Sequence, residues 1–249
     1  MIRALLIRRF WLLGSNITSS VVLSFLFPMI IFIFINLSFR RVLVNAVYDI
    51  DFDTWIYPSM VMLVSVLSII PSIFRDLFDL RIHKKVLTYL SLTPYSKSFL
   101  ISSFLFVSLI EGIIMALVSL LLYSFIIPYP FTLIETLSFF FYLSIMIIFL
   151  GNIFITLSIL SDKSATFFIS IFIIVFFILF GSGLVISLDF FPLSINNILS
   201  IVPIAMIVSA MQSYLFSGFI NWTITLIPIL FSSVLLIINS ILLRNKLRQ

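Results

Sequence analysis

The chain has no cysteine and a single histidine, His83, and each of these absences excludes a class of chemistry. Without thiols there is no disulfide framework, no thiolate zinc site and no cysteine nucleophile. One histidine cannot make a multi-histidine metal site such as H-E-x-x-H. None of the six glycines precedes a lysine, so the G-x-x-x-x-G-K-[ST] loop that cradles nucleotide phosphates is missing as well. We therefore expect no catalysis by this chain alone, and no cofactor or metal bound to it.

Charge is also scarce, because only 9% of the 249 residues are charged while 63% are hydrophobic, and the mean hydropathy is +1.34. A water-soluble domain of this length carries far more charge. The formal net charge of +5 does not indicate nucleic acid as a partner, since the basic residues cluster beside apolar stretches rather than on a water-facing surface. Composition thus predicts a protein embedded in membrane lipid.

Six apolar stretches are long enough to cross a bilayer core of about 30 Å as helices. They run over residues 21–37, 55–74, 99–127, 137–160, 165–188 and 222–243. The sequence therefore predicts an all-α membrane protein, with residues 1–249 forming one transmembrane domain of six spans.

The basic residues between these stretches indicate which way the spans run, since cytoplasmic loops are enriched in lysine and arginine. Alternate connections hold twelve of the 14 basic residues on one side and only Arg40 and Arg41 on the other, beside the acidic residues Asp49, Asp51 and Asp53. This bias predicts that both termini are cytoplasmic. We interpret Arg8 and Arg9 as cytoplasmic anchor charges of a retained N-terminus, because no signal-peptide cleavage site follows them.

Two connections are too long to be tight turns. Residues 75–97, on the cytoplasmic side, show apolar residues at helical spacing with basic residues away from them, which predicts an amphipathic surface helix ended by Pro94. Residues 189–221, on the opposite side, are apolar yet interrupted by Pro192 and Pro203, which favours short helices dipping into the outer leaflet. The apolar residues of the first connection are Phe78, Ile82, Val86 and Tyr89, and the basic ones are Arg81, Lys84 and Lys85.

Glu111 is the one ionisable residue near the middle of a predicted span, where insertion scales assign an acid or base a cost of roughly 2.5–3.5 kcal/mol. Ser108, Gly112 and Ser119 fall on the same side of that helix, so this face is expected to pack inward. Two interpretations remain open: a substrate or proton site on a pathway, or a carboxyl that fixes helix packing. Asn36, Asn152 and Asn239 are interpreted as packing contacts between helices.

Three motifs resemble the membrane subunits of ABC-2 type transporters, the six-span permeases of bacterial drug, lipid and polysaccharide exporters. The first is KKVLTYLSLTPYSKSFLIS between the second and third spans, the second is LSDKSAT between the fourth and fifth, and the third is GSGLVISLDFFPLSINNILSIVPIAMIVSAMQSYLFSG before the last span. With the span pattern, they cover nearly the whole chain. The sequence departs from the family pattern at two places. The acidic and glycine residues usual in the first cytoplasmic segment are replaced by Thr88 and Tyr89, and the asparagine usual before the second outer proline is replaced by Val202.

The resemblance implies an exporter subunit in the plasma (inner) membrane of a bacterium. The segment around Arg75 to Tyr89 would be a coupling helix that docks on a separate cytoplasmic ABC ATPase, of which two copies would bind ATP and Mg²⁺. Residues 1–20 would be an interfacial helix, and residues 189–221, with Pro192 and Pro203, an external lid. A second permease copy or a paralogue would complete the pathway, and membrane lipids would surround it.

Two other functions fit the residues. An ion-gradient-driven secondary transporter or channel would use Glu111 as its coupling site and need no ATPase. A haem-export-type accessory membrane subunit would show no transport by itself. The transported substrate is not readable from the sequence.

Overall fold

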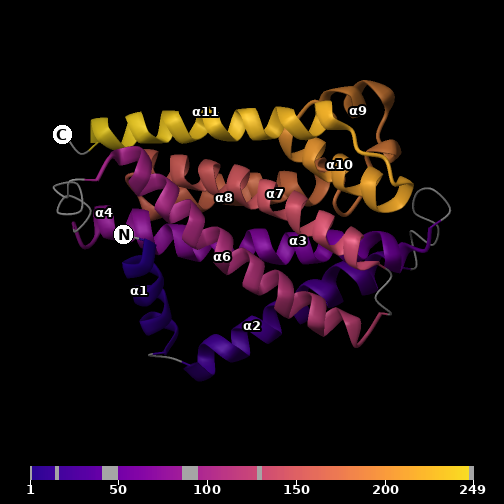
Figure 1. Cartoon of the computed structure of the whole chain (residues 1–249), viewed down its shortest axis with the longest axis horizontal. Coiled ribbons are helices and arrows are strands. Elements are labelled where there is room, and N and C mark those ends of the chain that lie inside the picture. The colour runs from indigo at the N-terminus through magenta and orange to yellow at the C-terminus, as the bar shows by residue number, and fades with distance from the viewer. Residues whose placement is uncertain (1, 15–16, 41–49, 86–94, 128–130, 247–249) are drawn as a thin grey trace.

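The structure is a computed structural model that describes residues 2–14, 17–40, 50–85, 95–127 and 131–246, and these residues form a bundle of helices (Figure 1). Within these ranges, six helices are long and apolar enough to cross a membrane. They confirm a multi-pass, all-helical membrane protein. The elements in chain order are α1 (Ile2–Gly14), α2 (Ile17–Phe32), η1 (Ile33–Leu37), α3 (Phe52–Ile73), η2 (Phe74–Asp79), α4 (Leu80–Ile82), α6 (Lys97–Ser124), α7 (Leu133–Leu160), α8 (Ser164–Gly181), η3 (Leu188–Phe190), α9 (Leu193–Leu199), α10 (Pro203–Ser217) and α11 (Trp222–Lys246).

The helix α3 forms the centre of the bundle, packed against α6 and α7. In its most apolar stretch 83% of residues are buried, against 22% in α8 at the periphery. The exposed apolar side chains of α8, including Phe168, Phe172 and Phe176, would be unfavourable in water but are suited to lipid. The burial pattern therefore agrees with a bilayer as the surrounding solvent.

The span boundaries agree with the predicted ones except at two places. The fifth span, predicted to reach residue 188, ends at Gly181, because Gly183 has φ +84° and breaks the helix with a conformation that suits glycine. The second span, predicted to end at residue 74, continues through η2 and α4 to Ile82.

This extension corrects the prediction of a separate surface helix beginning at residue 75. Phe78 is 0% exposed and stacks on Phe74 with ring centroids 5.0 Å apart, and both rings contact Phe167 of α8. The apolar face of this segment is thus covered by protein. The sequence could not distinguish this case from a surface helix, because a helix that faces a core has the same periodicity as one that faces a membrane surface. Val86, Tyr89 and Pro94 lie outside the described residues.

The η2 segment is a π-helical stretch of six residues, and a second one, η1, occurs in the first span. Each follows a proline inside the preceding helix, Pro71 and Pro28 respectively. Proline removes a backbone donor and crowds the preceding turn, so the regular hydrogen-bond ladder is disturbed near it. Wide turns of this kind often occur at functional positions.

The ends of the bundle are distinct (Figure 1). The marked N and C ends and α4 lie at one end, and α9 and α10 lie at the other. The helices α9 and α10 meet at 96°, with Pro192 as the N-cap of α9 and Pro203 as the first residue of α10. The connection for which short helices were predicted therefore contains the two helices α9 and α10.

Candidate functional site: a buried charge network

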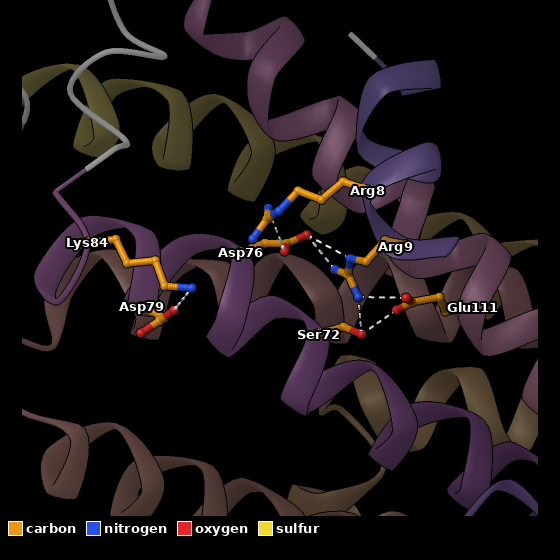
Figure 2. A network of polar contacts seen from close by, with 7 residues as sticks. All are labelled: Arg8, Arg9, Ser72, Asp76, Asp79, Lys84 and Glu111. Atoms are coloured by element: carbon orange, nitrogen blue, oxygen red, sulfur yellow. Dashed lines mark hydrogen bonds and ion pairs between the residues drawn. The ribbon is translucent and has the colours of Figure 1, made fainter. Parts of the chain in front are cut away.

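Five residues from three helices form a charge network close to the end that holds the termini (Figure 2). Arg8 and Arg9 come from α1, Ser72 from the last turns of α3, Asp76 from η2 and Glu111 from α6. Ser72 and Asp76 are four residues apart on one continuous helix, so both face α1.

The two arginines of α1 bind Asp76 from both sides. Arg9 donates from Nε and Nη2 to Oδ2, the first at 3.0 Å, while Arg8 donates from Nη1 to Oδ1 at 3.2 Å. The side chains of Arg9 and Asp76 are only 5% and 2% exposed. A buried carboxylate needs such charge-assisted donors, because its loss of hydration is otherwise uncompensated.

Arg9 also reaches Glu111, so one guanidinium joins two carboxylates. Its Nη1 donates to Glu111 Oε1 at 2.6 Å and to the Ser72 hydroxyl, and Ser72 in turn donates to Glu111 Oε2. Arg8 and Arg9 balance the formal charges of Asp76 and Glu111. The network therefore cross-links α1, the end of the second span and α6, and the partly buried Arg75 adds a third positive charge beside it.

This geometry changes the interpretation of Arg9 and adds Asp76 to the residues of interest. Arg9 was interpreted as an anchor charge, yet it is buried and bound to two acids. Glu111 is the acid of an ion pair, which agrees with the packing interpretation made from the sequence. Asp76 was not recognised as a site residue; the available signal was an acid within one turn of an apolar span, but its partner lies 67 residues away.

The other predicted residues of the α6 face are buried as expected. Ser108 is 1% exposed, and Ser119 is fully buried and donates back to the carbonyl of Met115. Gly112 lies against Ile147 of α7 and Ile69 of α3. This face therefore packs inward, and Glu111 is its charged member.

The predicted interhelical asparagine contacts are confirmed. Asn239 of α11 donates to the backbone oxygen of Asn152 in α7 at 2.9 Å and accepts a hydrogen bond from Thr156 at 2.7 Å. Asn36 donates to Asp53 at 3.0 Å near the opposite end of the bundle. Such contacts give membrane helices a fixed register.

The basic residues predicted for the coupling helix lie in two environments. Arg81 donates from Nη1 to Asp162 at 3.1 Å and from Nη2 to the carbonyls of Ser158 and Ser161, so it caps the C-terminal end of α7. Lys84 is exposed and pairs with Asp79 at 3.1 Å. Ile82 is partly buried against the core, and Lys85 is exposed. Of the predicted coupling residues that the structure describes, Lys84 and Lys85 are the exposed ones.

Asp162 joins three helices at this end. Lys246 of α11 donates to its two oxygens at 3.2 and 3.3 Å, opposite Arg81. The hydrogen bonds from Lys246 and then Arg81 hold the pKa of the Asp162 carboxyl below its usual value. The short LSDKSAT link thus ties the ends of the second and sixth spans to the turn between α7 and α8.

The described residues contain no group of three histidine, cysteine, aspartate or glutamate side chains placed to hold a metal ion. The charge network couples the positions of three helices. A displacement of the end of the second span must move α1 and α6 with it or break a buried ion pair. Comparison with known proteins gave no matching family model, curated protein or solved structure.

Proposed function

We propose that this chain is the permease subunit of an ATP-driven ABC exporter, in the plasma membrane of a bacterium, with both termini in the cytoplasm. It forms the pathway for an amphipathic, lipid-linked or drug-like substrate, together with a second permease copy or paralogue and two copies of a separate ATPase. The charge network is the observation that supports this proposal most. It connects the end of the second span, on which a cytoplasmic ATPase would act, with α1 and α6.

The basic bias supports the same orientation. The networks around Asp76 and Asp162 belong to the side that holds twelve of the 14 basic residues. The exposed side chains of Phe10 and Trp11 on α1 suit the lipid–water boundary, so α1 is the interfacial helix of this proposal.

The docking surface is narrower in this proposal than the sequence alone indicated. Lys84 and Lys85 contact the ATPase, while Phe78 and Arg81 fix the end of the second span to α7 and α8. Closure of the two ATPases moves the end of α3 as a rigid body, and Arg9 transmits the movement to α1 and α6. The pair α9 and α10 closes the pathway at the far side.

The first experiment is to purify the tagged chain from its native membrane in mild detergent and to identify what accompanies it by mass spectrometry. We expect an ABC ATPase at about one copy per permease chain. The double variant Lys84→Glu/Lys85→Glu should lose the ATPase, whereas Arg3→Glu, a charge reversal at an exposed position of α1, should keep it. Recovery of the wild-type chain without any ATPase contradicts the proposal.

Glu111 separates the leading proposal from the gradient-driven alternative. Glu111→Gln keeps a hydrogen-bonding side chain beside Arg9 and Ser72 but removes the titratable group. An ATP-driven exporter should retain transport in this variant, provided that it still assembles. If the wild-type protein purifies without an ATPase and a stable Glu111→Gln variant loses all transport, the ion-coupled transporter is favoured. If the chain purifies with an ATPase but the complex transports nothing by itself, the accessory subunit is favoured.

A further inference from the structure

A small polar cavity lies at the end of the bundle opposite the charge network. It is partly open, it is lined by the chain after α8, by η3, α9 and α10, and by Trp55 at the start of α3, and its volume is about 200 Å³. Pockets for drug-sized ligands measure about 300–1,000 Å³. The cavity therefore admits a small polar group rather than a whole amphiphilic substrate.

The serine hydroxyls that line this cavity have already committed their hydrogens to protein acceptors. Ser200, Ser209 and Ser213 each donate to the backbone carbonyl three residues earlier, and Ser182 donates to the carbonyl four residues earlier. A hydroxyl has one hydrogen and two lone pairs, so a committed hydroxyl offers a ligand only acceptor sites. These four side chains thus present oxygen lone pairs to the cavity.

Asp189 adds a negative charge to the same lining. Its carboxylate accepts a hydrogen bond from Ser187 at 3.3 Å, and no lysine, arginine or histidine of the described residues forms an ion pair with it. Gln212 donates one amide hydrogen to the carbonyl of Gly183 at 3.1 Å, which leaves its amide oxygen as an acceptor and its second N–H as a donor. The lining residue Asn196 adds one acceptor oxygen and two donor hydrogens, so acceptor atoms still outnumber donors. The cavity is therefore rich in acceptors and anionic.

We propose that this cavity binds a primary ammonium group, as found on an ethanolamine phospholipid headgroup or a small free amine. Three N–H donors and a positive charge match an acceptor-rich wall with one carboxylate, whereas a quaternary ammonium has no donor to offer. Trp55 adds an aromatic side chain to the lining. This inference does not depend on the direction or the energy source of transport.

The surroundings of the cavity suit a lipid as the source of the amine. Leu193 and Ile198 of α9 and Ile201 just after it are exposed apolar residues of the same segment that supplies Asn196 and Ser200 to the lining. A phospholipid would place its headgroup in the cavity and its chains along these residues. A free amine would use only the polar lining, and the two sources are separable by experiment.

The test is native mass spectrometry of the purified full chain titrated with phosphatidylethanolamine, phosphatidylcholine and free ethanolamine. We expect phosphatidylethanolamine to bind about tenfold or more tightly than phosphatidylcholine, since charge-assisted hydrogen bonds are lost with the quaternary headgroup. Binding of the phospholipid without binding of ethanolamine identifies the lipid as the source. Equal saturation by ethanolamine identifies a free amine.

Asp189→Asn is the matched variant, because it removes the charge from an exposed side chain and retains its size. It should weaken binding of the ammonium ligand by about tenfold. Asp51→Asn, which removes the same charge at an exposed position outside the cavity lining, should bind as the wild type does. Equal binding of the two phospholipids, or an unchanged affinity in a folded Asp189→Asn protein, overturns the proposal; thermal unfolding of both variants verifies that they are folded.

Discussion

Among single residues, Arg9 has the most consequential contacts. It is buried, it faces two acids from different helices, and it shares Asp76 with Arg8. A buried ion pair gives little net stability compared with apolar residues of the same volume, yet loss of one partner leaves an uncompensated charge. We therefore regard Arg9 as a residue that specifies how α1 is placed on the bundle.

Replacement of this residue gives the first prediction. Arg9→Gln should lower the free energy of unfolding by about 3–5 kcal/mol, because Glu111 loses its guanidinium partner and Asp76 keeps only Arg8. The measurement is SDS-induced unfolding in mixed micelles.

Arg3→Gln is the control for this prediction, since Arg3 is exposed on the same helix. The double variant Arg9→Gln/Glu111→Gln should be more stable than Arg9→Gln alone, because it also removes the unpaired carboxylate. Equal stability of Arg9→Gln and Arg3→Gln contradicts a role for the network in holding α1.

Between elements, close packing of α3, α6 and α7 depends on small residues. A Cβ atom at Gly112 of α6 would lie 2.6 Å from Cδ1 and 3.3 Å from Cγ1 of Ile147 in α7. At Gly151 of α7 the nearest atom would be Leu105 Cδ2, at 3.0 Å. Small residues of this kind let membrane helices approach each other closely.

The second prediction follows from this approach of α6 to α7. Gly112→Ala should destabilise the protein by about 1–3 kcal/mol, because the Cδ1 methyl of Ile147 must shift within a packed core. Gly14→Ala is the control, since a Cβ there has no neighbour within 4 Å.

Addition of Ile147→Val to Gly112→Ala removes the atom that clashes. The double variant should therefore lose less than the sum of the two single changes in the same unfolding measurement. Strict additivity would show that this contact does not limit the packing.

The contacts of Asp162 between α4, α7 and α11 predict a pH dependence. The pKa of this carboxyl is lowered in the folded protein from an ordinary value of 3.8, so its contribution to stability is present above that value. It disappears as the pH falls through the folded pKa. Asp162→Asn should thus melt at a slightly lower temperature than wild type at pH 7, and the difference should begin to close as the pH falls below 3.8. A difference that persists unchanged into acid contradicts this assignment.

For the whole molecule, the arrangement separates two ends with different chemistry. One end carries the charge network, the Asp162 contacts and the C-terminal end of α11, and the other carries the α9–α10 pair with its polar cavity (Figure 1). Our proposals place a protein partner at the first end and an amine ligand at the second. Both require the two ends to face opposite sides of the membrane.

The fourth prediction concerns this topology, and the absence of cysteine makes it direct to test. Asn245→Cys and Asn197→Cys each place one thiol at an exposed position, at opposite ends of the bundle. An impermeant maleimide added to intact cells should label Asn197→Cys and leave Asn245→Cys unlabelled until the cells are opened. The reverse pattern contradicts the cytoplasmic docking proposal.

The sequence by itself determined the helical membrane class, the six spans and the inward face of Glu111, because a bilayer demands long apolar helices and penalises isolated charge. It also indicated the asparagine contacts between helices. The tertiary structure alone decided that Arg9 is the partner of Glu111 and Asp76 and that Phe78 faces protein rather than a membrane surface. The reason is physical: periodicity shows which face of a helix is apolar, whereas the neighbour that covers this face or neutralises a charge comes from chain segments many residues away.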